Sequence, residues 1–236
     1  MSQRTDRILL ALREIMLTPT ARDEQVTIGP SDLGDPCDYH LGMKMAGEKP
    51  QREFSMFPWL GTAIHTLIEK LVSVKNLTLH PGMNEMAWEL FGAPSGARTE
   101  VKIFICNIPG YGDVWGSIDV LLIGENCIVD WKSSSLKKIK TYKLHGLDPS
   151  NQGQVIMYIG GARKAGYNVE AGVLVYIPRD GGDPSQIYAV EVPWDEAEFN
   201  SIIERATVIQ QWVAAGRWRE LDRDPHCYSC NPGYRP

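Results

Sequence analysis

Three charged residues stand inside two apolar segments at the middle of the chain. Asp119 lies in the run Gly116 to Ile123, and Asp130 and Lys132 lie in the run Ile128 to Ser134. A carboxylate inside an apolar strand is costly unless it is paired or bound to metal, and two neighbouring carboxylates repel each other without a cation. Carboxylate oxygens suit Mg²⁺ or Mn²⁺. An ammonium group beside such a site could polarise a phosphate and help to activate water.

The same residues also fit a simpler interpretation, in which Asp119 ends a strand and Asp130 forms a same-face ion pair with Lys132. Two residues on a later helix favour the catalytic interpretation. Gln154 and Tyr158 are spaced i, i+4, which places both side chains on one helical face.

His65 and Glu100 also favour the catalytic interpretation, although each has a simpler explanation. His65 lies with Glu69 at i+4 inside an apolar helical stripe, where a histidine is more often a core residue than a metal ligand. Glu100 stands at the start of a strand, on the opposite parity from Val101 and Ile103, and could simply be a solvated strand end.

A run of lysines follows the candidate site: Lys137, Lys138, Lys140 and Lys143. Such a run is either a solvated loop or a track for nucleic-acid phosphates, and the sequence favours neither strongly. The position of the run beside the acidic residues makes contact with a DNA backbone the more useful hypothesis.

The five cysteines do not suggest a disulfide framework, because their number is odd and a reducing compartment is expected. Cys106 and Cys127 lie in apolar strand patterns and are expected in the core. Cys227 and Cys230 have the spacing of a metal-chelating pair. Cys37 is the third candidate ligand, and His40 and His226 are the histidines nearest to these cysteines.

The elements that must position these residues can be read from periodicity. Apolar spacings of three and four predict a helix over 59–74, and alternation predicts strands over 101–105, 112–123 and 127–131. Further helices are expected over 5–17, 36–46, 149–165 and 195–215, and further strands over 169–177 and 186–192. This order predicts one α/β domain over residues 1–236, with a mixed central sheet flanked by helices.

Bulk properties are those of an ordinary soluble globular protein. The chain has 236 residues, 43% of them apolar, and a formal charge of −5, which neither supports nor excludes nucleic-acid binding. No run is apolar enough to span a bilayer, and the N-terminus resembles an amphipathic helix rather than a signal peptide. We therefore expect no membrane association and a cytoplasmic location, in a bacterial cell or a phage-infected host.

The candidate motifs, taken in their order along the chain, resemble the PD-(D/E)xK nuclease superfamily, in its RecB-like branch of CRISPR-associated and phage exonucleases. The resemblance covers about residues 31–178, and no single motif is specific, whereas the ordered set is. The matching residues are His65, Glu100, Gly116-x-x-Asp119, Asp130-x-Lys132 and Gln154-x-x-x-Tyr158.

The resemblance implies a restriction-endonuclease-like core and DNA cleavage with Mg²⁺ or Mn²⁺. His65, Asp119, Asp130 and the Trp131 carbonyl would be metal ligands. Lys132 would activate water or hold the scissile phosphate, and Gln154 and Tyr158 would orient the lysine or contact DNA. Many relatives also hold an iron–sulfur cluster on one early and three late cysteines.

Cys37, Cys227 and Cys230 match three of those cluster positions, and the last one falls where the chain ends at Pro236. His40 or His226 could supply the missing ligand of a cluster or a Zn²⁺ site joining the two ends of the domain, or the metal could have been lost. The leading hypothesis is a DNA exonuclease in recombination, repair or phage DNA processing, with recombination or replication proteins as further partners. A structure-dependent or single-strand endonuclease and a non-catalytic DNA-binding subunit stay open, as do cleavage polarity and oligomeric state.

Overall fold

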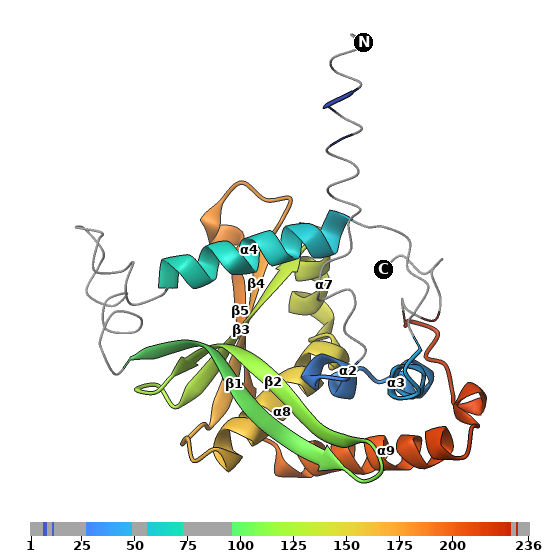
Figure 1. Ribbon diagram of the computed structural model, residues 1–236. Helices are drawn as coiled ribbons and strands as arrows, with labels where there is room; N and C mark the ends of the chain where they lie inside the picture. The colour runs from blue at the N-terminus through green and yellow to red at the C-terminus, as the bar shows by residue number, and fades with distance from the viewer. Residues whose placement is uncertain are drawn as a thin grey trace.

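A mixed sheet forms the centre of the protein (Figure 1). The computed structural model describes residues 7, 8, 11, 27–48, 56–72, 96–227 and 230, without the side chains of 56–59. The five strands of the sheet lie side by side in chain order, and only β3 and β4 are parallel neighbours. They are β1 (Ala97–Ile108), β2 (Gly112–Leu122), β3 (Cys127–Ser134), β4 (Ala171–Pro178) and β5 (Tyr188–Pro193). The sheet confirms the expected α/β class.

Helices lie on both sides of this sheet (Figure 1). They are α2 (Pro30–Gly34), α3 (Asp38–Met45), α4 (Met56–Val72), α7 (Leu136–His145), α8 (Pro149–Lys164) and α9 (Glu196–Ala214), with single 3₁₀ turns η2 (Pro184–Gln186) and η3 (Trp218–Glu220). The helices expected over 36–46, 149–165 and 195–215 are confirmed to within two residues, and α4 begins three residues before the expected 59. The helix expected over 5–17 lies largely outside the described residues.

The basic segment after β3 is a helix, which the lysine-rich pattern did not reveal. The hydroxyl of Ser135 caps α7 by accepting a hydrogen bond from the Lys138 amide at 3.3 Å, and Ile139 is buried beneath the helix. A parallel β3–β4 pair needs a long crossover, and α7 and α8 together supply it.

Two apolar clusters fill the two sides of the sheet. The larger one lies beneath α8 and α9 and includes Ile118, Ile128 and Leu174. The smaller one includes Val120 and Val129, with Val72 at the end of α4 packed against it. Since Val155 to Ala162 of α8 are all buried, this helix is apolar on every side there, as expected of an element enclosed by other elements.

Near the middle of the β1–β2 hairpin, the apolar side chains change from one core cluster to the other. Ile118 packs in the larger cluster and Val120 in the smaller one, although both have the same strand parity. On β1 the change falls at Glu100, whose φ of 50° is unusual for a residue other than glycine. Asp119 therefore lies between the two cores rather than inside either of them.

Two glycines allow α2 and α8 to pack in backbone contact. A Cβ atom at Gly153 would lie 2.8 Å from the Gly34 Cα, closer than a side chain could be accommodated. This contact fixes the first turns of α8, where Gln154 begins the polar face. None of the described helices combines the length and the apolar character that crossing a bilayer would take.

Candidate active site

The candidate site lies where β2 and β3 separate. The ladder between them runs from Leu122–Cys127 to Val120–Val129 and then stops. At the next position the Asp119 carboxylate accepts a hydrogen bond from the Trp131 backbone amide at 2.9 Å. The Asp119 carboxylate therefore takes the place of a backbone hydrogen-bond acceptor. It lies in the gap where the two strands separate, which we call the β2–β3 fork.

On the α8 side of the fork, four side chains form one polar network. The Lys132 ammonium lies 2.7 Å from Asp130 Oδ2 and donates to Gln154 Oε1 at 2.8 Å. The Gln154 amide in turn donates to Asp130 Oδ1 and to the Tyr158 hydroxyl, both at 3.4 Å. The structure thus brings together the four residues that strand and helix spacing had placed on common faces. Gln154 fixes the position of the lysine.

A glycine explains why the tyrosine can reach this network. A Cβ atom at Gly116 would lie 2.7 Å from Tyr158 Cε1 and 2.6 Å from Pro30 Cγ. Only a residue without a side chain leaves room for the Tyr158 ring beside β2. The spacing Gly116-x-x-Asp119 therefore reflects packing as well as chemistry.

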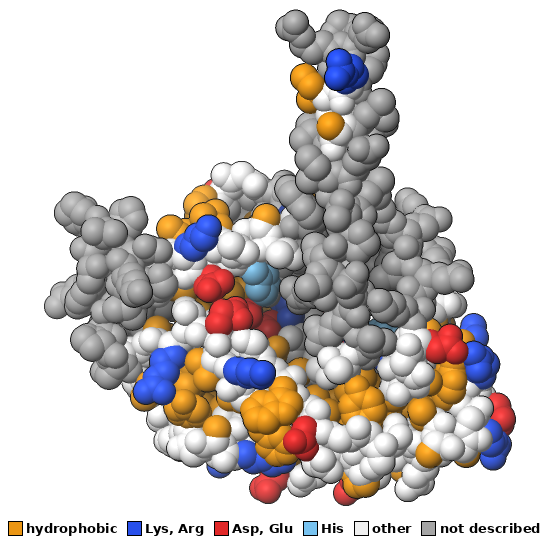
Figure 2. Space-filling model, viewed as in Figure 1, with side chains coloured by type: hydrophobic (Ala, Val, Ile, Leu, Met, Phe, Trp, Pro, Cys, Tyr) orange, Lys and Arg blue, Asp and Glu red, His pale blue; other side chains and the backbone are white. Residues whose placement is uncertain are grey.

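His65 and Glu100 reach the site from two other directions. His65, on α4, places Nδ1 3.5 Å from Asp119 Oδ2. Glu100, on β1, accepts a hydrogen bond from the Ser117 hydroxyl at 2.7 Å and adds negative charge near Asp119. Figure 2 shows a histidine, acidic side chains and basic side chains on the face between α4 and the β1–β2 hairpin. Ser117 was not predicted, and nothing in its local sequence singles it out.

The two carboxyl groups of the site lie in surroundings that disfavour a negative charge on both of them. Asp130 is only 3% exposed. Burial, together with the charge of Asp130, raises the pKa of Asp119 to about 7, against the lowering effects of the Trp131 amide and Lys132. Burial and the same charge also raise the pKa of Tyr158, which stays a neutral hydroxyl.

Such a pair of acids fits a hard divalent cation, because a cation would relieve the repulsion that raises the pKa of Asp119. The donor set is oxygen-rich, with the His65 imidazole within reach. Within the described residues, however, no three histidine, aspartate or glutamate side chains of this site place their ligand atoms within 4.8 Å of one another. The roles of His65, Asp119, Asp130 and the Trp131 carbonyl as ligands stay predictions.

The raised pKa of Asp119 predicts how stability depends on pH in chelator. Between its ordinary pKa of 3.8 and about 7 the folded protein holds a proton that the unfolded chain releases. Stability should therefore fall as pH rises through this range. Asp119→Asn removes the effect, so it should stabilise the protein by about 1–3 kcal/mol at pH 8, at about 1.4 kcal/mol per pKa unit, and by little at pH 4.

Urea unfolding at both pH values, in chelator, measures this difference. Asp113→Asn is the matched control, because Asp113 is an exposed residue of the same strand. A difference between wild type and Asp119→Asn that is the same at pH 4 and pH 8 would contradict the assignment.

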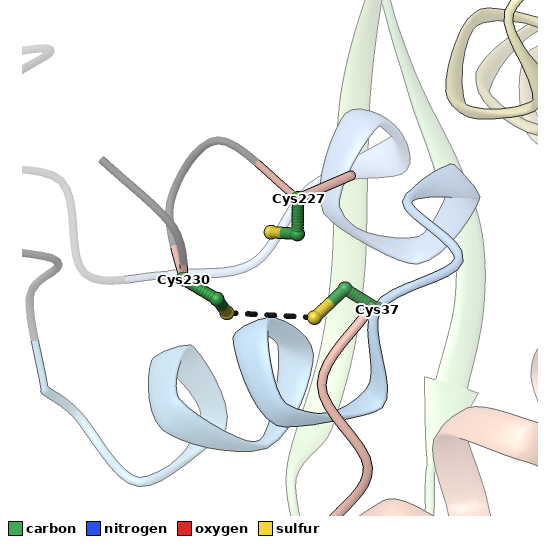
Figure 3. Close-up of side chains that lie close together, drawn as sticks. All are labelled: Cys37, Cys227 and Cys230. Carbon is green, nitrogen blue, oxygen red and sulfur yellow. Dashed lines mark hydrogen bonds between the residues drawn. The ribbon is translucent and has the colours of Figure 1, made fainter. Parts of the chain in front are cut away.

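The cysteines form a second cluster, away from the acids. Figure 3 shows Cys37, Cys227 and Cys230 facing one another, and their sulfur atoms all lie within 4.8 Å. Cys37 and Cys230 are 3.5 Å apart. A hydrogen bond from the Cys227 thiol, followed by the amides of Asp224 and His40, lowers the pKa of Cys37 to about 5 despite burial. Three cysteines so placed could hold a metal ion.

The remaining cysteine and histidine predictions have separate outcomes. Cys106 is buried in the larger core as expected. Cys127 is only partly buried, and it packs against the smaller cluster. His40 is buried beside the cysteine cluster, whereas His226 is exposed. Asp35, which the sequence analysis did not single out, accepts a hydrogen bond from the Cys37 amide at 2.9 Å. The short Asp-Pro-Cys segment could have indicated this turn.

An exposed aromatic residue lies close to the acids along the same hairpin. Trp115 is 48% exposed and packs edge-on against Phe104, with ring centroids 5.5 Å apart. The Lys102 ammonium lies 5.6 Å from the Trp115 ring centre. Lys102 is paired in the ladder with Ser117, which holds Glu100. A basic and aromatic surface therefore adjoins the acidic site.

Comparison with known proteins finds structures with a similar fold. No protein-family model matches the chain, and no curated protein matches it either. Solved structures do match it, among them three that are described as exonucleases. The first is LHK-Exo in complex with dAMP, with 13% identity, a TM-score of 0.52, and coverage of 83% of this chain and 91% of the other.

The second is an alkaline exonuclease (LHK-Exo) from Laribacter hongkongensis, with 12% identity, a TM-score of 0.51, and coverage of 84% of this chain and 92% of the other. The third is a candidate exonuclease from Eubacterium rectale, with 16% identity, a TM-score of 0.50, and coverage of 93% and 95%. At these identities the similarity concerns the fold, and the fold of this chain is that of structures described as exonucleases.

Proposed function

We propose that the protein is a divalent-metal-dependent deoxyribonuclease that hydrolyses phosphodiester bonds at Asp119, Asp130 and Lys132. The proposal rests mainly on one observation. Two acids from neighbouring strands meet at the β2–β3 fork beside an ammonium group that Asp130 and Gln154 hold in place. The fold shared with exonuclease structures supports it independently.

Each residue has a distinct role in this proposal. Asp119 and Asp130 would hold Mg²⁺ or Mn²⁺, with His65 and the Trp131 carbonyl as further ligands and Glu100 adding negative charge. The bound metal would polarise the scissile phosphate and make a water molecule more acidic. Lys132 would place its positive charge where negative charge develops in the transition state. Gln154 and Tyr158 would keep Lys132 in that position.

The surface formed by Lys102, Phe104 and Trp115 would receive a single-stranded end of the substrate. Its exposed ring offers a base a stacking surface, and Lys102 attracts the phosphate beside it. Figure 2 shows hydrophobic and basic side chains beside the acidic ones on this face. Lys137, Lys138, Lys140 and Lys143 of α7 would contact the DNA backbone on the other side of β3, and Lys137 and Lys140 are exposed there.

Trp115→Ala should weaken binding of single-stranded DNA by about 10-fold to 100-fold, because stacking of one base on an aromatic ring contributes about 1–3 kcal/mol. Fluorescence anisotropy with a labelled oligonucleotide, in chelator to prevent cleavage, measures the change. Trp115→Phe should bind nearly as well as wild type, since it keeps a ring. Equal affinity of the alanine variant and wild type would remove this surface from the proposal.

Two activities are compatible with this site, and the proposed one is exonuclease action in recombination, repair or phage DNA processing. The exposed stacking surface also favours a single-strand or structure-dependent endonuclease. End-labelled linear duplex, linear single strand and closed circular single strand, each with Mn²⁺ or with chelator, separate the two. An exonuclease leaves circles intact and releases nucleotides from linear ends, whereas an endonuclease opens circles. A non-catalytic binding subunit leaves every substrate intact, and that result would contradict the proposal.

A further inference from the structure

Glu100 occupies an unfavourable place in the β1–β2 hairpin. The ladder pairs its neighbours Thr99 and Val101 with the residues on either side of Asp119, so the two acids face each other on adjacent strands. Like charges that face each other across a sheet are destabilising. The charge of Glu100 also acts on Asp119, since after burial and Asp130 it is a further cause that raises the pKa of Asp119. A glutamate at this position therefore costs stability.

The backbone of Glu100 adds a second cost. Its φ of 50° lies in the left-handed region, which glycine adopts freely and a glutamate adopts rarely. Residues held in such conformations gather at functional sites, where other contacts keep them in place. A functional role of the carboxylate would explain why a glutamate occupies a position that suits it so poorly.

The Ser117 hydroxyl holds this carboxylate. It donates to Glu100 Oε2 at 2.7 Å, a length typical of a hydroxyl bonded to an ionised acceptor. Within the described part of the chain, no other hydrogen bond or ion pair involves the Glu100 side chain. The partner of Ser117 across the ladder is Lys102, so the bond to Glu100 runs diagonally along the hairpin. Ser117 is thus the residue that orients the third acid of the site.

We propose that Ser117 is a positioning residue, which holds Glu100 so that its carboxylate accepts a hydrogen bond from a water molecule on the metal. This inference rests on the proposed function. A direct metal contact fits less well, because the described side chains of Glu100, Asp119 and Asp130 do not bring three ligand atoms within 4.8 Å of one another. Mg²⁺ keeps several of its water ligands when one or two carboxylates bind it, and a nearby carboxylate can accept hydrogen bonds from them. Ser117 would act only through Glu100.

A double-mutant cycle separates this role from a direct contact between the serine and DNA. In single-turnover cleavage with Mn²⁺, Ser117→Ala should lower the rate by at least about 10-fold, as the loss of a group that orients a metal site usually does. In a Glu100→Gly background, where glycine accommodates the φ of 50°, the same substitution should change the rate by less than about twofold. An equal loss in both backgrounds would overturn the proposal, because Ser117 would then act without Glu100.

Metal affinity provides a measurement that does not depend on cleavage. Isothermal titration should show Mn²⁺ binding weakened by about 10-fold in Ser117→Ala. Ser117→Thr keeps the hydroxyl and should restore both affinity and rate. Thermal unfolding in chelator should be the same for both variants and wild type, because the bond lies at the surface. Wild-type Mn²⁺ affinity in Ser117→Ala would overturn the proposal.

The same hairpin offers a matched control. Asn107→Ala removes the hydrogen bond from Asn107 to the Asp113 carboxylate at 2.7 Å, which is also an exposed bond between β1 and β2. This variant should bind Mn²⁺ and cleave DNA as wild type does, and an effect as large as that of Ser117→Ala would show that any such bond in the hairpin matters equally. Wild type that neither binds Mn²⁺ nor cleaves would overturn the proposed function itself, whereas active wild type with an unaffected Ser117→Ala would overturn this inference alone.

Discussion

Asp119→Asn and Asp130→Asn should each lower the rate of Mn²⁺-dependent DNA cleavage by about 1000-fold or more. A catalytic metal contributes several kcal/mol to transition-state stabilisation, and each loss of about 1.4 kcal/mol slows the reaction tenfold. Either substitution removes one of the two charges that would hold the ion at the β2–β3 fork. Single-turnover cleavage of a labelled linear duplex measures the rate.

Folding should survive these substitutions, because each one relieves repulsion between two neighbouring acids. Circular dichroism and thermal unfolding in chelator check this point for both variants. Asp113→Asn, on the exposed end of β2, should cleave at the wild-type rate. Undiminished cleavage by either folded active-site variant would place the chemistry elsewhere.

Lys132→Ala should lower the same rate by about 100-fold to 1000-fold, the usual effect of removing one group that stabilises developing charge. Its ammonium lies between Asp130 and Gln154, at 2.7 Å and 2.8 Å. Affinity for Mn²⁺, measured by isothermal titration, should not fall, because the lysine repels the ion rather than binding it. Loss of metal binding together with activity would show that the role of Lys132 is misassigned.

Lys132→Arg is the informative companion to that variant. It keeps the positive charge but replaces a compact ammonium by a planar guanidinium, which would not fit between the same two partners. If position matters as much as charge, this variant should recover only a small part of the lost rate. Full recovery would mean that charge alone suffices and that Gln154 does not position the group.

Short-range periodicity predicted the site well where its residues share one element. Asp130 and Lys132 are two positions apart on a strand, and Gln154 and Tyr158 are four apart on a helix, so each pair lies on one face by geometry alone. The mixed sheet followed from the order of the elements. These features could be predicted from the sequence because they do not depend on tertiary contacts.

Long-range relations could not be read in the same way. The change between core clusters falls at Glu100, a residue with an unusual backbone angle, and the role of Gly116 depends on a ring from α8. His40 and His226 were equivalent by spacing, and only tertiary packing buries one and exposes the other. The lysine-rich sequence of α7 did not predict a helix, because the apolar face of α7 is short and Ile139 is its one fully buried residue.

Metal dependence of cleavage tests the central claim most directly. The rate of cleavage of labelled linear DNA is measured while Mn²⁺ is added to protein first treated with chelator, for wild type and Asp130→Asn in parallel. Wild type should show no cleavage without the ion, then a rate that rises with Mn²⁺ and saturates, and Asp130→Asn should stay near the background throughout. Full-rate cleavage by wild type in chelator, or equal Mn²⁺ curves for the two proteins, would contradict a metal site at Asp119 and Asp130.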